Sequence, residues 1–243
     1  MRNRPSNRSP APINMDTEPR SRDGALLRLL QLTSPTLPIG AFAYSQGLEY
    51  AVQAQWVHDE TSARTWIIGV MREGVARLDV PMLARLYRAW SVNDDEALDY
   101  WSAYLRASRE AAELREEDRQ LGMALARLLR DLEIAEAAPW LTRPQASLAT
   151  LFALAAVRWD ISLRDAANGY LWSWTEAQVA AAVKLVPLGQ TAGQRILSHA
   201  VLEITAAAAA GLSVDDGEIG YAAPRLAIGS ALHESQYSRL FRS

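Results

Sequence analysis

Apolar residues recur at the spacing of an α-helix through almost the whole chain. Ile67, Val70 and Met71 begin one such stripe, and the leucines of residues 121–132 repeat the spacing. No segment alternates apolar and polar residues over the several positions that a strand needs. The pattern predicts an all-α fold, a single globular helical-bundle domain of about eight to ten helices that spans residues 23–243.

Local sequence predicts where some of these helices begin. Ser162 stands three residues before Asp165, a spacing in which the serine can cap the first turn of a helix. Pro81 precedes an apolar stripe over residues 83–90, and proline suits the first turn because it has no N–H to donate. We therefore expect one helix to begin near Ser162 and another near Pro81.

Residues 1–22 differ from the rest of the chain. They hold five arginines, two acids and four of the eleven prolines, with few large apolar side chains. Such a segment cannot bury enough apolar surface to offset the entropy of ordering it, so we expect a disordered basic tail. It also lacks the apolar stretch of a secretory signal. No uncharged apolar run reaches the ~18 residues of a membrane span, so we expect a cytoplasmic protein that does not bind membranes.

Two predicted helices, 169–188 and 192–212, are apolar on most sides and rich in alanine. A helix of this kind is buried in the centre of a domain or in a subunit interface, which makes a homodimer our expectation. Residues 93–136 instead hold twelve acids against six arginines. We interpret this stretch mainly as a solvated helix face with arginine partners, and the alternative is an acidic docking surface.

Composition excludes several functional classes. The chain has no cysteine, which rules out thiol nucleophiles and thiolate metal sites. Its only lysine, Lys184, does not follow a glycine-rich loop, so a Walker-type nucleotide site is absent. The formal net charge is −3, and a nucleic-acid-binding protein would instead show a basic stripe.

Catalytic and metal-binding candidates are few. The Ala43-Tyr-Ser-Gln-Gly47 run approaches a serine-hydrolase nucleophile elbow centred on Ser45, but that motif needs a strand before the serine and a histidine and an acid beside it. His199 and Glu203 lie four residues apart and form half a metal site; a hydrogen-bonded core pair is the interpretation we favour. A serine hydrolase and a metal-binding protein remain the alternatives to a binding protein without catalytic activity.

Two segments have features that amino-acid composition alone does not explain. Residues 34–49 combine two prolines with Gly40, Phe42 and Tyr44 where the chain enters a helix. Residues 233–243, the C-terminal tail, interleave aromatic and leucine side chains with arginines, although terminal segments are usually polar. Aromatic and arginine side chains dominate the energetics of interfaces. The C-terminal tail either packs on its own domain or becomes ordered on a partner.

Three motifs together resemble the UreF family of urease accessory proteins. They are Ser34-Pro-Thr-Leu-Pro-Ile-Gly-Ala-Phe-Ala-Tyr-Ser-Gln-Gly-Leu-Glu49, then Lys184-Leu-Val-Pro-Leu-Gly-Gln-Thr191, and the ending Gln236-Tyr-Ser-Arg-Leu-Phe-Arg-Ser243. The resemblance covers residues 24–243 and leaves the N-terminal segment outside it.

The resemblance implies an all-α homodimer that is not an enzyme and binds no cofactor stably. Its partners would be the accessory protein UreD, also called UreH, the nickel-carrying GTPase UreG, and the subunits of apo-urease. Nickel would be the cargo of the complex, and GTP would be bound by the partner GTPase. The function implied is that of a scaffold for GTP-dependent insertion of nickel into the urease active site, in which this chain modulates the GTPase. The alternative is a chaperone that binds nickel directly.

Two sets of site residues follow from the motif positions. The set expected to face UreD/UreH is His233, Gln236, Tyr237, Arg239, Leu240, Phe241 and Arg242. The set expected to face UreG, or to form the dimer face, is Pro38, Gly40, Tyr44, Ser45, Glu49, Lys184 and Gln190. No residue is assigned a catalytic, cofactor-binding or metal-binding role.

Overall fold

The computed structural model describes residues 22–220 and 223–243, and this part of the chain contains ten α-helices and no strand. The all-α prediction and the expected number of helices are confirmed. The α-helices are α1 Arg22–Leu32, α2 Leu48–Gln53, α3 Glu60–Val70, α4 Ala76–Val92, α5 Asp95–Ser108, α6 Ala112–Asp131, α7 Leu148–Arg158, α8 Leu163–Leu185, α9 Gln190–Leu212 and α10 Pro224–His233. Short 3₁₀ turns lie at Ala41–Ala43, Ala135–Leu141 and Asp216–Glu218, and a π-helical turn lies at Met71–Val75.

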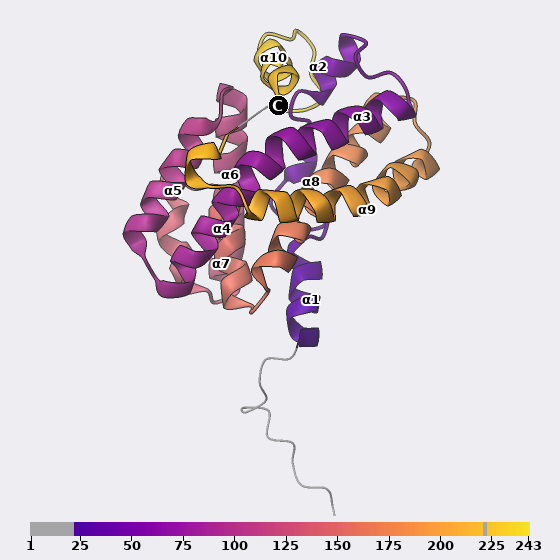
Figure 1. Ribbon diagram of the computed structural model, residues 1–243. Coiled ribbons are helices and arrows are strands. Elements are labelled where there is room, and N and C mark those ends of the chain that lie inside the picture. The colour runs from indigo at the N-terminus through magenta and orange to yellow at the C-terminus, as the bar shows by residue number, and fades with distance from the viewer. Residues whose placement is uncertain (1–21, 221–222) are drawn as a thin grey trace, which may run out of the picture.

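Helix α4 runs through the middle of the larger of two apolar cores and packs against α5, α7, α8 and α9 (Figure 1). Leu83 and Leu86 are fully buried there. Trp90 is buried as well, and its indole Nε1 donates a hydrogen bond of 2.9 Å to the Thr150 carbonyl oxygen of α7. The polar atom of this large side chain is therefore satisfied inside the core, as burial of a tryptophan requires.

The position of Pro81 differs from the prediction. Helix α3, the π-helical turn and α4 follow one another without a break, and Pro81 lies inside α4 rather than in its first turn. A proline at this position leaves the carbonyl of Arg77 without its helical N–H partner. The backbone N–H of Gly220 donates to that oxygen over 3.3 Å, which replaces the missing bond and explains how the helix continues.

Helices α8 and α9 form a long antiparallel pair on one side of the molecule, as the orange ribbons in Figure 1 show. Ser162 caps α8 through a bond from the Asp165 N–H to its Oγ, so the predicted start is confirmed. Side chains of α2, α3, α8, α9 and α10 enclose the second apolar core, in which Leu48, Ile67 and Ile196 are fully buried. This smaller core is where the C-terminal tail packs.

Helix α9 is, among the described helices, the one long and apolar enough to cross a membrane by length and composition. The sequence had indicated no apolar run of that length. Core helices of globular domains meet the same criterion, and α9 packs against α8, α4 and α3. Its other side exposes Val201 and Leu202, at 50% and 81%. One face of α9 is apolar because it packs against these helices, whereas the face with Val201 and Leu202 is exposed.

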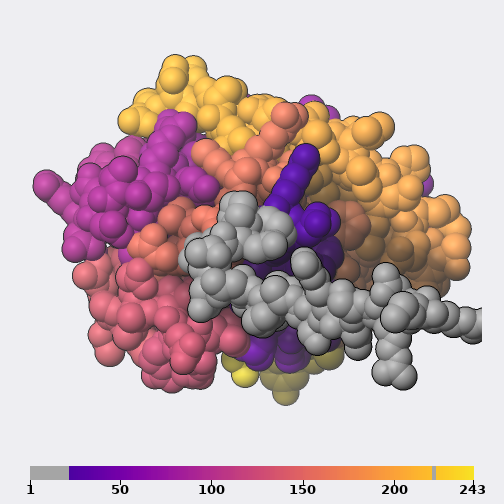
Figure 2. All heavy atoms as spheres, turned by 90° about the horizontal axis from the view of Figure 1, so that it is seen from below, coloured from indigo at the N-terminus to yellow at the C-terminus, as the bar shows by residue number. Residues whose placement is uncertain are grey.

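Helix α1 lies at one edge and exposes three leucines, Leu26, Leu27 and Leu30. Figure 2 looks onto the molecule from this side and shows α1 near the centre of that face. Arg22 is the first residue of α1, so the predicted tail does not extend to it. The remainder of that tail, residues 1–21, lies outside the described residues.

The acidic stretch 93–136 forms α5, α6 and the 3₁₀ turn that follows. Its acids pair with arginines near the surface: Asp99 with Arg143, Glu116 with Arg119, and Glu136 with Arg158. These pairs agree with the interpretation of a solvated helix face. Glu113, Glu117 and Asp118 are different because they turn inward from α6.

Candidate functional site: the docked C-terminal tail

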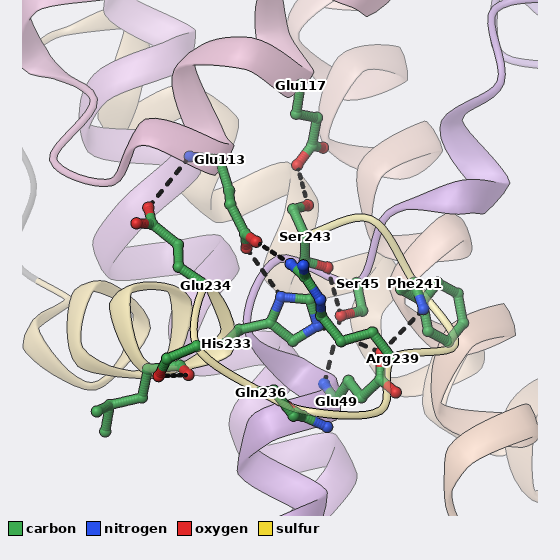
Figure 3. Close-up of polar contacts among 12 residues, drawn as sticks. Ser45, Glu49, Glu113, Glu117, His233, Glu234, Gln236, Arg239, Phe241 and Ser243 are labelled. Atoms are coloured by element: carbon green, nitrogen blue, oxygen red, sulfur yellow. Dashed lines mark hydrogen bonds and ion pairs between the residues drawn. The ribbon is translucent and has the colours of Figure 1, made fainter.

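The C-terminal tail folds back onto its own domain and lies over α2 and α6 (Figure 3). Ser243 is buried, and its main-chain oxygen accepts three hydrogen bonds from the segment before α2. The donors are the Ser45 N–H at 2.7 Å, the Gln46 N–H at 3.0 Å and the Ser45 hydroxyl at 2.6 Å. Two segments nearly 200 residues apart in sequence are joined in this way.

Glu49 holds the tail from α2. One carboxylate oxygen accepts the backbone N–H of Leu240 at 2.7 Å, and the other accepts that of Phe241 at 2.9 Å. Gly47, with φ of 75°, turns the chain into α2. A Cβ at Gly47 would come within 3.0 Å of the Ser230 nitrogen of α10, so glycine permits both the turn and the close approach of these helices.

His233, the last residue of α10, lies fully buried between two carboxylates. Its Nδ1 is 2.8 Å from Glu113 of α6, and its Nε2 is 3.3 Å from Glu49 of α2. Arg239 reaches the second oxygen of Glu113 over 2.6 Å. Arg239, Glu113, His233 and Glu49 thus form a chain of polar contacts beneath the tail, as Figure 3 shows.

Glu117 binds the end of the tail. Its carboxyl group accepts the Ser243 hydroxyl at 2.6 Å and the Gln46 side-chain amide at 2.7 Å. Burial raises the pKa of Glu117 to about 7, because the ionised form loses its hydration, although these two hydrogen bonds oppose the shift. Trp174 of α8 donates its indole N–H to the same Gln46 and fixes that amide in position.

Apolar and cationic contacts complete the docking. The ring of Phe241 is buried in the second core, and the Lys184 ammonium nitrogen lies 5.8 Å from its centroid. The Arg242 N–H donates to the Ala43 carbonyl oxygen. Burial raises the pKa of the Tyr44 hydroxyl, and the Arg242 side chain opposes this effect.

The C-terminal tail and α10 expose four large apolar side chains. Tyr237 is fully exposed and Leu240 is 66% exposed. On α10, Ile228 and Leu232 are half exposed and stand four residues apart, on one face of the helix. We call these four residues the tail surface.

The structure joins the two predicted sets of site residues. Ser45 and Glu49, which we had assigned to another interface, hold the tail through hydrogen bonds, and Lys184 contacts Phe241. Among the described contacts of the tail, none involves Pro38, Gly40 or Gln190. These three are at least partly exposed, and Gly40 has a φ of 80° that starts the 3₁₀ turn.

Ser45 lacks the surroundings of a nucleophile. It is completely buried, it follows a 3₁₀ turn rather than a strand, and its hydroxyl donates to Ser243. The hydrolase alternative requires a histidine beside the serine, and the described hydrogen bonds of this hydroxyl involve main-chain groups of Ser243 and Glu49.

The favoured interpretation of His199 and Glu203 as a core pair is wrong. His199 is exposed on α9, and Glu203 pairs with Arg72 of the π-helical turn at 3.4 Å. The two residues do lie on one face of α9, as their spacing predicts, but that face lies at the surface beside α3 and the π-helical turn. Within residues 22–220 and 223–243, no group of three or more histidine or acidic side chains has the arrangement of a metal site.

Sequence reasoning missed Glu113, Glu117 and Gln46. The acids were counted within a charged stretch, which hid the fact that Glu117 lies on the same helical stripe as Leu114 and Leu121. A carboxylate on an apolar stripe is the indication that could have identified it, because such a group must find partners inside the fold.

A cavity of about 150 Å³ lies beside the docked tail and shares Tyr44, Gln46 and Glu117 with it. Its walls come from the end of α1, the segment before α2, α6 and α8, and Phe42 borders it with 70% of its surface exposed. A buried ion cluster also lines the cavity. In this cluster Arg109 bonds both Asp79 and Asp118, and Tyr170 donates to Asp79. These contacts connect α4, α6 and α8.

The fold and the site define an all-α domain on which the chain's own C-terminal segment packs. The family model described as UreF matches residues 57–201, which is more than half of the chain. The urease accessory protein UreF of Alkalilimnicola ehrlichii is 56% identical over 216 residues, which is 89% of this chain and 95% of the relative. The corresponding proteins of Hahella chejuensis and Chromohalobacter salexigens are 49% and 47% identical, over 90% and 94% of this chain and 98% and 100% of their own lengths. The chain belongs to the UreF family of urease accessory proteins.

Proposed function

We propose that this chain is a non-enzymatic scaffold for urease maturation in the cytoplasm. It binds UreD/UreH, recruits the nickel-carrying GTPase UreG and acts on apo-urease, so that nickel is inserted in a GTP-dependent step that the scaffold modulates. Nickel is the cargo, and GTP is bound by the partner. The observation that carries the proposal is the tail surface, an exposed aromatic and leucine surface held in place by a buried polar network.

The tail surface supports the assignment to UreD/UreH. An exposed tyrosine beside leucine and isoleucine side chains is the composition of an interface centre, since large apolar side chains there contribute most of the binding free energy. The segment is already ordered on its own domain, so binding to it requires less loss of conformational entropy than binding a disordered segment. We place Tyr237 and Leu240 at the centre of this interface.

Lys184 supports a second surface for UreG. It is exposed at the end of α8 and lies over Phe241, so the shape of the surface around it depends on whether the tail is docked. Tyr44, Ser45 and Glu49 are buried beneath the tail and would act through it rather than by direct contact. The two partner surfaces are therefore adjacent and share the C-terminal tail.

The α1 side supports a homodimer. Leu26, Leu27, Leu30 and Phe42 are each more than half exposed, which is more large apolar surface than α9 exposes. Phe42 and the cavity that it borders lie on this side, so a two-fold interface here would include both. We propose this side as the dimer face.

Co-purification with UreD/UreH tests the main proposal. The variant carries Tyr237→Ala and Leu240→Ala, and the control carries Val92→Ala, which removes a comparably exposed apolar side chain at the far end of α4. We expect the double variant to weaken binding at least about tenfold, because two central interface side chains are lost, and the control to bind as the wild type does. Equal binding by both variants would remove the tail surface from the interface.

A further inference from the structure

The imidazole of His233 occupies an unusual position, because each of its two nitrogens faces a carboxylate from a different helix. Glu113 of α6 lies on the Nδ1 side and Glu49 of α2 on the Nε2 side. The ring has no exposed surface, so water cannot replace either partner. The docked state therefore has to satisfy both nitrogens with these two acceptors.

A neutral imidazole has one N–H donor and one lone pair, whereas an imidazolium has two N–H donors. With a neutral ring, one nitrogen would direct its lone pair at a buried carboxylate oxygen, and that contact is repulsive. With a protonated ring, both contacts become charge-assisted hydrogen bonds, which are the strong kind. The geometry of the docked tail fits the protonated form.

The two carboxylates that bind His233 are also the ones that bind the tail. Glu49 accepts the N–H groups of Leu240 and Phe241, and Glu113 accepts Arg239. The charged groups that face the ring are thus Glu49 from α2, Glu113 from α6 and, through Glu113, Arg239 from the tail. Two positive and two negative charges balance when the ring is protonated, and one negative charge is left over when it is not.

We propose that His233 is a proton-operated switch that controls docking of the C-terminal tail. The protonated ring holds Glu49 and Glu113 in the positions that bind the tail. Loss of the proton as the pH rises breaks one of these contacts, leaves a buried carboxylate without its cationic partner, and releases residues 236–243. The regulatory consequence rests on the proposed function, because release dismantles the tail surface to which we assign UreD/UreH.

Hydrogen exchange of the tail amides in the full chain tests the switch in the absence of any partner. The reporters are the N–H groups of Leu240 and Phe241, and their protection is followed from about pH 5.5 to about pH 8.5, corrected for intrinsic exchange, on both sides of the ordinary histidine pKa of about 6.5. We expect protection to fall at least about tenfold over this range, because one charge-assisted hydrogen bond is lost. Amides inside α4 should show no such fall.

Three variants separate His233 from other titrating groups. In His233→Gln, the tail amides should have low protection at every pH. In His199→Gln, which replaces an exposed histidine on α9, the fall should match the wild type. In Glu117→Gln the fall should also persist, although this acid binds Ser243. If Glu117→Gln rather than His233→Gln removed the fall, the carboxyl group would be the switch and the proposal would be wrong.

A measurement on the wild-type chain covers the case in which His233→Gln does not fold. The nitrogen chemical shifts of the His233 ring report its protonation directly, and we expect both nitrogens to carry a proton while the tail amides are protected. A neutral ring beneath a protected tail would overturn the proposal. Neither outcome depends on UreD/UreH, so a tail surface that failed to bind that partner would contradict the proposed function and leave the switch intact.

Discussion

At the scale of single residues, Glu117 links proton binding to folding stability. Its pKa in the folded chain is about 7, above the ordinary glutamate value, so the folded state binds this proton more tightly than the unfolded state does. The free energy of unfolding should therefore fall as the pH rises from about 4.5 to about 7, by about 3 kcal/mol in total. The stabilisation is lost once the pH exceeds the pKa of Glu117 in the folded state.

The variant Glu117→Gln should remove this pH dependence. The amide stays neutral, so the variant should match the wild type near pH 5 and be more stable than it near pH 8, as measured by urea unfolding. Glu116→Gln is the matched control, because Arg119 lowers the pKa of that neighbouring carboxyl to about 2, outside this pH range. Parallel stability curves for wild type and Glu117→Gln would contradict the assignment.

The polar network that holds the tail was the part of the site that sequence could not predict. Patterns identified Glu49 and the C-terminal tail as unusual, but the tail's partners Glu113 and Glu117 are acids in a stretch full of acids. Which of them turn inward depends on how α6 rotates against α2 and α10, and that is a property of tertiary packing. Hydrogen bonds between residues so far apart in the chain produce no local pattern in a single sequence.

At the scale of helices, the close crossing of α9 and α4 depends on Gly211. A Cβ at this position would lie 2.8 Å from a Val80 methyl carbon and closer still to the Ala76 carbonyl oxygen. Backbone cannot yield as a flexible side chain does, so the helices would have to separate. The crossing is therefore fixed by the absence of a side chain.

We expect Gly211→Ala to destabilise the chain by about 1–3 kcal/mol, the cost of overpacking a tight interior. Gly69→Ala is the control, since Gly69 lies in α3 with nothing within 4 Å of its added Cβ. Alanine there should stabilise the helix by up to about 1 kcal/mol. Denaturant midpoints of both variants measure the difference, and an unchanged midpoint for Gly211→Ala would show that the crossing can relax.

Helical periodicity predicted the elements well because each helix carries its own apolar stripe. The start of α8 at Ser162 followed from local capping chemistry. The error at Pro81 arose because a distant backbone group, Gly220 N–H, satisfies the carbonyl that the proline leaves open. Local rules fail where a partner from another part of the chain supplies what the local sequence lacks.

At the scale of the whole molecule, two exposed apolar faces, one on α1 and one on α9, are compared as the interface of the proposed dimer. Leu27→Glu places a charge on the α1 face, and Leu202→Glu places one on α9, where the side chain is 81% exposed. We expect Leu27→Glu to yield monomers in light scattering at micromolar concentration, because an unpaired charge is costly in an apolar interface. Leu202→Glu should keep the wild-type mass.

The opposite result, with monomers from Leu202→Glu alone, would move the dimer face to α9. A wild-type chain that is monomeric at this concentration would contradict the homodimer itself. Both variants change exposed side chains, so helicity by circular dichroism should remain as in the wild type and exclude unfolding as the cause.

The bond between Ser45 and Ser243 also has a consequence for synthesis of the protein. These residues are separated by 198 positions, and the second is made after all ten α-helices that the structure describes. In a nascent chain on the ribosome, Glu49 and Glu117 therefore lack the hydrogen bonds that the tail donates to them. The tail can dock only after Ser243 has been synthesised, so shorter chains would lack the docked tail.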